Sequence, residues 1–480
     1  MSLDTPITPS GRNAPPTYDS SKAPTGERAA AKYDFDLFVV GGGSGGVRAA
    51  RIAAVHGARV GIAEQKYWGG TCVNVGCVPK KLMTMASHFA ADFSDAAGFG
   101  WEVPPARHDW QALMRNKNVE IARLNGVYRA LLSSAGCMLF DDRATLVDAH
   151  TLRVGGSTVT ADKILIAVGA WPVMSETPGV REHAITSNDV FELERMPGRM
   201  LIVGGGYIGV EFAGIFRGLG ADVTLVCRSD WLLRGFDQDL AIHLVEEMRK
   251  KGVVVRLTTD VMSIVKDGDR LRATFGDGTA IGIDCAMYAV GRKPSTDGLG
   301  VDAAGVALDA DGAILVDADY RTSVPNIYAI GDATDRVNLT PSAIAEGHAL
   351  ADTLFGSLPH APSYENIPSA VFSDPPVGAA GLTEAVARTR YEKVDVYRSE
   401  FRPLRHAVSG RDERTLMKLV VDGGTGRVLG CHMVGADAPE IIQGFAVALN
   451  AGATKDQFDA TIGVHPTAAE EFVTMRTLTK

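Results

Sequence analysis

The sequence predicts an α/β protein with two Rossmann-like nucleotide-binding domains and a C-terminal α+β domain. The first observation behind this prediction is an apolar strand, a glycine-rich turn and a helix at residues 36–55, and the second is the same order of elements from residue 200. The third is the C-terminal part of the chain, where extended segments at 416–421 and 428–434 precede a helix with apolar residues on one face. Because strands and helices alternate before this part, doubly wound domains are expected there and a separate domain after them.

The first glycine-rich unit has every part of a dinucleotide-binding site. Gly41 allows a tight turn after the strand 36–40, Gly43 lets the backbone approach a pyrophosphate, and Gly46 allows the helix to pack closely on the strand. The next strand ends in Glu64, whose carboxylate can accept hydrogen bonds from a ribose diol. A glycine turn alone can be purely structural, but with its strand, helix and acid this one predicts an FAD site.

The second unit repeats the layout with Gly204, Gly206 and Gly209, but its second strand does not end in an acid. Arg228 follows that strand and Arg234 comes six residues later. Both could bind the 2′-phosphate of NADP, which a carboxylate would repel. Solvated surface arginines are the alternative, but the missing acid favours NADPH.

Cys72 and Cys77 follow the first unit directly, in a run that also contains several glycines and a proline. On a plain helix this separation would leave the two thiols about 140° apart, so a bent chain is expected to bring them together. Two small buried hydrophobes, or half of a metal site, are the alternatives. No second Cys/His pair occurs at ligand spacing, which argues against zinc, so we expect no metal and predict a redox-active disulfide.

Composition excludes several classes of protein. The 480 residues carry a net charge of −9, which argues against broad binding to nucleic acid or anionic membranes. Six cysteines are too few and too scattered for a secreted disulfide framework, so those outside the 72/77 pair are expected to be free core thiols. No stretch is long and apolar enough to span a bilayer. Residues 1–33 are expected to form a mobile tail, and the cytoplasm is the favoured location, with organelle import of a precursor left open.

Two further strands bear on the first domain. The strand 163–169 closes it, and the strand 326–332 turns at Gly331 and presents Asp332, a carboxylate placed to bond ribityl hydroxyls. An N-cap or a turn acid is the alternative for Asp332. The expected boundaries are 34–171 and 294–362 for the FAD-binding domain, 172–293 for the NADPH-binding domain and 363–480 for the C-terminal domain.

Together, the two glycine turns, the cysteine run, Gly331-Asp332 and the ending His-Pro-Thr-Ala-Ala-Glu-Glu resemble the pyridine nucleotide-disulfide oxidoreductases over residues 36–480. The run Cys-Val-Asn-Val-Gly-Cys-Val-Pro-Lys-Lys is similar to that of the glutathione- and trypanothione-reducing members, whereas lipoamide dehydrogenases typically end it with Cys-Ile-Pro-Ser-Lys. The resemblance implies NADPH-dependent reduction of oxidised glutathione through FAD and a Cys72–Cys77 disulfide.

The resemblance also assigns roles around the dithiol. The isoalloxazine would lie between the nicotinamide, near Tyr207, and the disulfide, with Cys77 nearer the flavin and Cys72 as the thiol that exchanges with substrate. Lys80, paired with Glu211, would stabilise charge that builds up on the reduced flavin, with ordinary surface residues as the alternative. Further positions that match the family are Ser44, Thr71, Gly169 and Thr340 for FAD, and Ile208 and Gly291 for NADPH.

Disulfide exchange needs a thiolate attacker and a protonated leaving thiol, so a group that titrates near neutrality is required. His465 is the candidate, with Glu470 holding its ring tautomer, although a lone histidine would more often be structural. In the family this segment, which includes Glu471, reaches the active site of the other subunit. The resemblance therefore implies a homodimer in which the C-terminal domain forms the interface.

Substrate choice depends on fewer residues. Arg51 matches the family's glutathione-contacting arginine, Arg48 adds a second cation, and Tyr128 is similar to the tyrosine that packs at the substrate; surface arginines and a core tyrosine are the alternatives. Oxidised glutathione carries about two net negative charges, so cations favour it over polyamine-linked trypanothione. His348 stands where an arginine is common, which predicts a weaker or pH-dependent carboxylate contact. Gly209 stands where the NADPH-using members usually have an alanine. This position therefore bears on how strictly the protein prefers NADPH over NADH.

Several other functions are disfavoured by residues of this chain. An NAD-linked lipoamide dehydrogenase in a large acyl-transfer complex is disfavoured by Arg228 and Arg234, and a trypanothione-type reductase by Arg48 and Arg51. Mercuric and selenium-type thioredoxin reductases carry extra C-terminal thiols, which this chain lacks. A non-catalytic flavoprotein that binds partners through its C-terminal domain would not need the intact cysteine pair.

Overall fold

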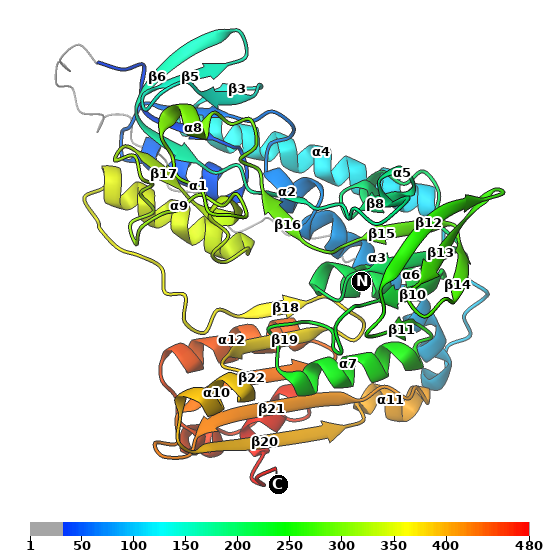
Figure 1. Ribbon diagram of the computed structural model, residues 1–480. Helices are drawn as coiled ribbons and strands as arrows, with labels where there is room; N and C mark the ends of the chain where they lie inside the picture. Colours follow the sequence, from blue (N-terminus) through cyan, green and yellow to red (C-terminus); the bar gives the residue numbers. More distant parts are fainter. Residues whose placement is uncertain (1–31, 480) are drawn as a thin grey trace, which may run out of the picture.

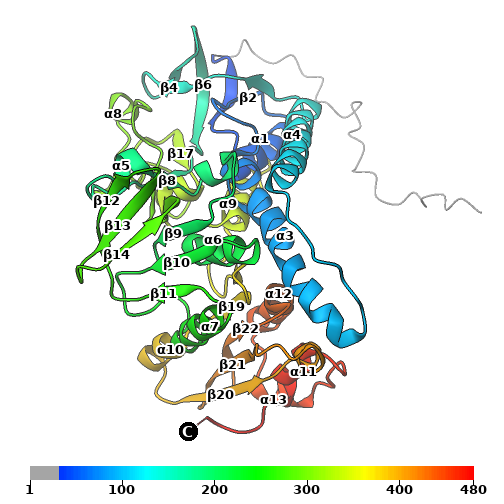
Figure 2. The same cartoon turned by 90° about the vertical axis from the view of Figure 1, so that its right-hand side faces the viewer.

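The computed structural model describes residues 32–479, so the tail expected at 1–33 lies outside the described residues except for Lys32 and Tyr33. The chain forms three lobes, which occupy the top, the right and the bottom of Figure 1. The turned view in Figure 2 shows helix α3 (Cys77–Ala96) running from the first lobe towards α11 (Leu404–Ser409) of the third. None of the helices in residues 32–479 combines the length and apolar character that crossing a membrane requires.

The first lobe is built on a parallel sheet with strand order β3-β2-β1-β6-β17, and β5 and β4 extend it as an antiparallel meander from β6. β1 lies inside this sheet because its residues are almost all apolar, and Leu37, Phe38 and Val39 are at most 2% exposed. The strands are β1 (Phe35–Val40), β2 (Val60–Ala63), β3 (Met138–Phe140), β4 (Ala144–Leu146), β5 (Thr151–Val154), β6 (Ser157–Ile166) and β17 (Ile327–Ala329). Besides α3, its helices are α1 (Ser44–Val55), α2 (Gly70–Asn74), α4 (Trp110–Ser134), α8 (Val301–Ala304) and α9 (Thr340–Phe355), with 3-10 turns at Ala97–Phe99 and Gly331–Thr334.

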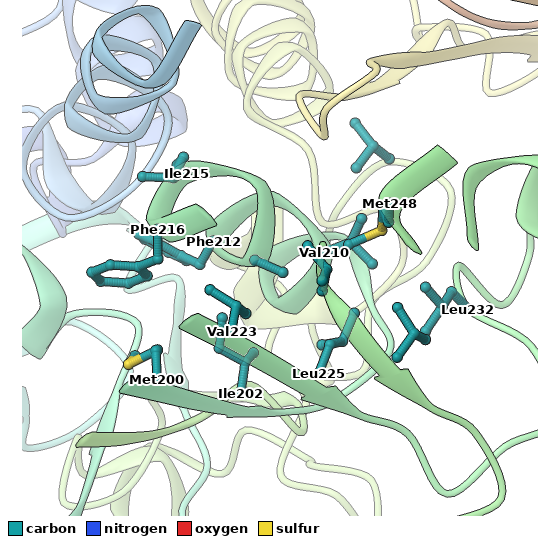
Figure 3. Close-up of a cluster of buried hydrophobic side chains, with 14 of the residues drawn as sticks. Met200, Ile202, Val210, Phe212, Ile215, Phe216, Val223, Leu225, Leu232 and Met248 are labelled. Atoms are coloured by element: carbon teal, nitrogen blue, oxygen red, sulfur yellow. The ribbon is translucent and has the colours of Figure 1, made fainter. Parts of the chain in front are cut away.

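The second lobe has a parallel sheet of order β11-β10-β9-β15-β8 and a separate antiparallel sheet of order β12-β13-β14. Figure 3 shows its core, where Phe212 and Phe216 of helix α6 lie over Met200, Ile202 and Val223 of the sheet. The strands are β8 (Ala184–Thr186), β9 (Arg199–Val203), β10 (Asp222–Val226), β11 (Val254–Arg256), β12 (Val261–Asp267), β13 (Arg270–Phe275), β14 (Ala280–Ile283) and β15 (Cys285–Tyr288). The helices are α5 (Val180–His183), α6 (Tyr207–Gly218) and α7 (Gln238–Lys250), with a 3-10 turn at Asp189–Glu192.

Two short antiparallel strands, β7 (Ala170–Pro172) and β16 (Arg292–Pro294), join the first two lobes. The chain passes from the first lobe to the second along β7 and returns along β16.

The third lobe is an antiparallel sheet of order β18-β19-β22-β21-β20, with helix α12 packed on β19 and β22. Its extended segments and helix correspond to those expected from the sequence, and Leu449 of α12 is buried while Ile441 and Phe445 pack beside it. The strands are β18 (Ser369–Val371), β19 (Val377–Gly381), β20 (Val394–Phe401), β21 (Thr415–Asp422) and β22 (Val428–Val434). The remaining helices are α10 (Glu384–Arg390), α12 (Ala438–Asn450), α13 (Lys455–Ala460) and α14 (Glu471–Thr474), with a 3-10 turn at Ala468–Glu470.

Candidate active site

The two glycine turns have matching geometry. Gly41 has φ +112° and Gly204 has φ +129°, a region of backbone conformation that favours glycine. A Cβ at Gly46 would lie 2.0 Å from the carbonyl oxygen of Gly41, and one at Gly209 would lie 2.1 Å from that of Gly204. Each helix therefore packs against its turn too closely for a side chain, and alanine at position 209 would require the backbone to shift.

One cavity of about 1710 Å³ joins the first turn to the second and third lobes. It is larger than the roughly 300–1,000 Å³ typical of a site for one small ligand. Of the residues expected to bind FAD, all but Gly46 line it: Gly41, Gly43, Ser44, Glu64, Thr71, Lys80, Gly169, Asp332 and Thr340. From the second unit, Tyr207, Ile208 and Glu211 line it, whereas Gly204, Gly206, Gly209 and Gly291 do not.

The residues around the first turn fit a dinucleotide such as FAD. A Cβ on Gly43 would meet only Gly70, at 3.9 Å, so the space beyond the turn is free for a ligand next to the N-terminus of α1. Glu64 is fixed by backbone N–H groups of Gly42 and Lys66, each 2.8 Å from one of its oxygens. Asp332 lines the same cavity, where burial raises its pKa and the charge of Arg292 opposes that shift.

The cysteine run bends between its two thiols. Cys72 lies in α2 and Cys77 begins α3, and the chain between them leaves helical geometry at Val75 and Gly76. This bend places the two thiols in hydrogen-bond contact, which their spacing on a continuous helix would prevent. Both are free thiols in this structure, which therefore shows the reduced form of the pair.

Asn74, between the cysteines, fixes this bend. Its Nδ2 donates to the carbonyl oxygens of Trp68 and Gly70, at 3.1 and 2.9 Å. Its Oδ1 accepts a hydrogen bond of 2.8 Å from Asn125 of α4. The loop is thus tied both to the chain before Cys72 and to the neighbouring helix.

The two thiols differ in their proton affinity. The hydrogen bond from Cys72 lowers the pKa of Cys77 to about 6, and Thr340 and Lys80 act in the same direction. The hydroxyl oxygen of Thr340 lies 3.6 Å from the sulfur of Cys77. The same thiol–thiol hydrogen bond, together with burial, raises the pKa of Cys72. The reduced pair therefore carries a thiolate on Cys77 and a proton on Cys72.

Lys80 forms an ion pair at the junction of all three lobes. Its Nζ lies 2.6 Å from Oε1 of Glu211, a residue of α6 that is 3% exposed. The same carboxylate oxygen accepts a hydrogen bond of 2.8 Å from the backbone N–H of Phe372, just after β18, and Nζ lies 4.2 Å from the centre of the Phe372 ring. Burial raises the pKa of Glu211, and the charge of Lys80 opposes this shift. The lysine charge is thus held beside Cys77 by groups from two other lobes.

His465 and Glu470 form a pair on the surface of the third lobe. Nδ1 of His465 lies 3.1 Å from both carboxylate oxygens of Glu470. The histidine side chain is 80% exposed and that of the glutamate 23%. Neither they nor Glu471 line the cavity of their own chain.

The residues expected to bind the substrate divide into two groups. Tyr128 of α4 has a pKa raised chiefly by burial, with further contributions from Cys72 and, in the opposite direction, from Arg48 and Arg51. Tyr128 is therefore within electrostatic range of both the dithiol and the two arginines, although none of the three residues lines the cavity.

His348 belongs to the second group, because the structure does not bring it to the cavity. Its Nε2 lies 3.4 Å from Asp352, one turn further along α9, and Asp352 also contacts Nε2 of His56 at 2.7 Å and Nε2 of His360 at 3.9 Å. The carboxylate partner of His348 in this structure is therefore a residue of its own helix. A contact between His348 and substrate stays a prediction.

Arg228 and Arg234 lie in the loop after β10, which folds back onto the second glycine turn. The backbone N–H of Leu233 donates to the carbonyl oxygen of Gly205 at 2.7 Å. Arg234 donates to the hydroxyl of Ser229 at 3.2 Å, and within residues 32–479 no carboxylate forms an ion pair with either arginine. Two cations without acidic partners therefore stand beside this turn.

Two residues of the site were not found from the sequence. Arg292 lines the cavity, and its charge opposes the rise in pKa that burial causes in both Tyr207 and Asp332, one from each nucleotide-binding lobe. Phe372 holds Glu211 and contacts Lys80 and Lys81 through its ring. An arginine after a glycine, or a phenylalanine just after a short strand, gives no local signal of such contacts.

Comparison with known proteins places this geometry in a family. Residues 35–347 match "Pyridine nucleotide-disulphide oxidoreductase" and residues 367–476 match the dimerisation domain of the same name. The chain is 54% identical to a glutathione reductase from Burkholderia cepacia, 49% to one from Nostoc and 41% to a trypanothione reductase from Trypanosoma congolense. These alignments cover 93%, 92% and 92% of this chain and 99%, 100% and 95% of the relatives. The chain belongs to the pyridine nucleotide-disulphide oxidoreductases.

Proposed function

We propose that the protein is a homodimeric enzyme that contains FAD and uses NADPH to reduce oxidised glutathione to two molecules of glutathione. The observation that carries this proposal is the hydrogen-bonded pair Cys72 and Cys77, with its thiolate on Cys77, in a cavity that also reaches both nucleotide-binding lobes. The relatives named glutathione reductase are 47–54% identical to the chain, and the trypanothione reductase is more distant at 41%. This ranking supports glutathione as the substrate.

FAD, when bound, passes two electrons from NADPH to the Cys72–Cys77 disulfide. The residues of the chain supply the electrostatics for that transfer. Lys80, held by Glu211, places a positive charge next to Cys77 and helps to keep its sulfur as a thiolate. Tyr207, which begins α6 of the second lobe, and Arg292 line the same cavity, where the nicotinamide would bind.

Reduction of the substrate then follows as two thiol–disulfide exchanges. The sulfur of Cys72 attacks one sulfur of oxidised glutathione, which forms a mixed disulfide and releases the first glutathione thiolate. The Cys77 thiolate attacks the Cys72 sulfur, which releases the second glutathione and restores the disulfide. Because Cys72 holds a proton at rest, a base must accept this proton, and an acid must protonate each glutathione that leaves. The partner subunit's His465 serves as both, with Glu470 fixing its ring.

Several observations support a site shared between two subunits. His465 is largely exposed and lies outside the cavity of its own chain, so its ring is free to act on a second copy. Large apolar side chains are exposed near it and along α3, among them Ile462 at 94%, Val464 at 72%, Met85 at 57% and Phe89 at 56%. Association would bury these side chains, and residues 367–476 match a dimerisation domain.

We place the enzyme in the cytoplasm. The cysteines outside the redox pair are free thiols in this structure, and Cys137, Cys227 and Cys431 are buried. Free buried thiols suit a reducing compartment, where structural disulfides are rare.

Purified protein with NADPH is expected to reduce oxidised glutathione faster than lipoamide or trypanothione disulfide. The reason is local charge, because Arg48 and Arg51 near the dithiol attract an anionic disulfide and repel a cationic one. Arg51→Ala should raise KM for oxidised glutathione more than it lowers kcat. Arg123→Ala, which removes an exposed arginine paired with Glu120 on α4, is the matched control. A side-by-side assay in which lipoamide is turned over faster would refute the substrate assignment.

Loss of Arg228 or Arg234 is expected to weaken NADPH binding by about 1.5 to 3 kcal/mol, the range for hydrogen bonds to charged groups. Binding of NADH should hardly change, because it lacks the 2′-phosphate. The ratio of the two KM values is the measurement, with Arg270→Ala, an exposed arginine of β13, as the control. A wild-type enzyme that prefers NADH would contradict the assignment.

A further inference from the structure

A carboxylate that the mechanism does not use is buried in the first lobe. Glu346 of α9 is only 1% exposed, and a buried charge is costly unless its oxygens are hydrogen-bonded. Its Oε2 accepts a hydrogen bond of 2.7 Å from the backbone N–H of Gly331, and its Oε1 accepts one of 2.6 Å from the hydroxyl of Tyr364. Both oxygens therefore have partners at the short distances typical of charge-assisted hydrogen bonds.

The bond to Gly331 acts on the turn that carries Asp332. Gly331 follows β17 with φ +66°, is itself buried, and begins the 3-10 turn in which Asp332 is the next residue. Without Glu346 the N–H of Gly331 would be left buried and unpaired, a state that costs free energy and favours other conformations of the turn. The orientation of the Asp332 carboxylate in the cavity therefore depends on Glu346.

The bond to Tyr364 connects Glu346 to a different part of the chain. Tyr364 belongs to the segment 356–368, which leads from α9 to β18 and so from the first lobe to the third; this segment crosses between the lobes on the left of Figure 1. Its hydroxyl oxygen also accepts a hydrogen bond of 3.2 Å from Nη2 of Arg336, and the same Nη2 lies 3.9 Å from Glu346. The connecting segment thus holds the carboxylate in place, and Arg336 supplies a positive charge.

We propose that Glu346 is a positioning residue for FAD, which acts by fixing the Gly331–Asp332 turn and is itself fixed by Tyr364. The inference rests on the role of Asp332 in the FAD site proposed above. It makes retention of the cofactor depend on the segment that connects the first lobe to the third.

Release of FAD from the diluted holoenzyme, followed by the fluorescence of free flavin, tests this proposal without measuring activity. Asp332→Asn serves as the reference for weakening the contact between Asp332 and FAD. Glu346→Leu removes both carboxylate oxygens of Glu346 while keeping a similar side-chain volume. We expect both to raise the FAD dissociation constant by about 10- to 100-fold, the equivalent of one or two hydrogen bonds to charged groups. Glu346→Gln should remain close to wild type, because its amide oxygen can accept from Gly331 and its NH₂ can donate to Tyr364.

Tyr320→Phe is the matched control, since the Tyr320 hydroxyl lies 3.2 Å from that of Tyr364, whereas the hydrogen bonds of Glu346 come from Gly331 and Tyr364. It should release FAD as the wild type does. If Asp332→Asn loosens FAD and Glu346→Leu does not, the inference is wrong and the FAD site stands. If Asp332→Asn has no effect, the assigned role of Asp332 fails and the inference fails with it.

Two further outcomes decide the remaining cases. If Glu346→Gln releases FAD as readily as Glu346→Leu, hydrogen bonding to Gly331 is not what holds the cofactor, and the proposal is overturned. If the Glu346→Leu protein does not fold, the Tyr364→Phe variant takes its place in the experiment. Tyr364→Phe removes the hydrogen bond from the Tyr364 hydroxyl to Glu346 and keeps the ring. This variant should raise the dissociation constant by about 3- to 10-fold, and an unchanged constant would reject the proposal.

Discussion

Replacing Cys72 by Ser is expected to abolish reduction of oxidised glutathione while NADPH still reduces the bound flavin. Cys72 forms the only bond between enzyme and substrate in the proposed cycle, so no exchange can begin without it. The hydride step comes earlier and does not use this sulfur. Anaerobic titration with NADPH, followed by flavin absorbance, should show normal reduction, and a steady-state assay with oxidised glutathione should show none.

Cys285→Ser is the matched control for this experiment. Cys285 lies in β15 of the second lobe, is partly buried and does not line the cavity. Its loss should leave both flavin reduction and turnover intact. Normal turnover by the Cys72→Ser enzyme would show that Cys72 is not the exchange thiol.

Replacing His465 by Ala should lower turnover by about 10²- to 10⁴-fold, the usual contribution of a positioned acid or base. The loss is expected because Cys72 holds its proton at rest and the leaving glutathione needs one. Reduction of the flavin by NADPH should hardly change. His183→Ala, which alters α5 in the second lobe, controls for general effects of removing a histidine.

Mixed dimers test where His465 acts. A dimer of one Cys72→Ser chain and one His465→Ala chain contains one complete site if the histidine serves the partner, and no complete site if it serves its own chain. Activity should therefore return when the two inactive chains are co-expressed and heterodimers are purified. Verified heterodimers without activity would contradict a site shared between subunits.

The fold class could be predicted because its signals are local in the sequence. An apolar strand, a glycine turn and a helix occupy neighbouring residues, so the run from 36 predicted β1 and α1, and the run from 200 predicted β9 and α6. The two Rossmann-like domains and the C-terminal α+β domain are confirmed, as is membership of the family. The helical spacing of apolar residues also predicted helix α12 of the third lobe, in which Leu449 is buried.

The rest of the site depends on contacts between segments that are far apart in the chain. Phe372 and Arg292 act on residues of other lobes, and Glu346 bonds Gly331 and Tyr364, which are 15 and 18 residues away in the chain. No residue near them in sequence indicates those partners. The position of His348 is different, because Asp352 stands four residues later on the same helix. That spacing predicts a side-chain pair and could have been recognised.

The meeting of Lys80, Glu211 and Phe372 has a consequence for how such proteins diversify. Each residue comes from a different lobe, and the buried carboxylate at the centre loses a partner if the Lys80 side chain is replaced or if the backbone N–H of Phe372 is displaced. A lobe transplanted from a distant relative would keep its own turn and sheet, but it would have to bring a matching surface at this point as well. The three lobes are therefore constrained to be inherited together, and chimaeras should fail first at this contact rather than within any one core.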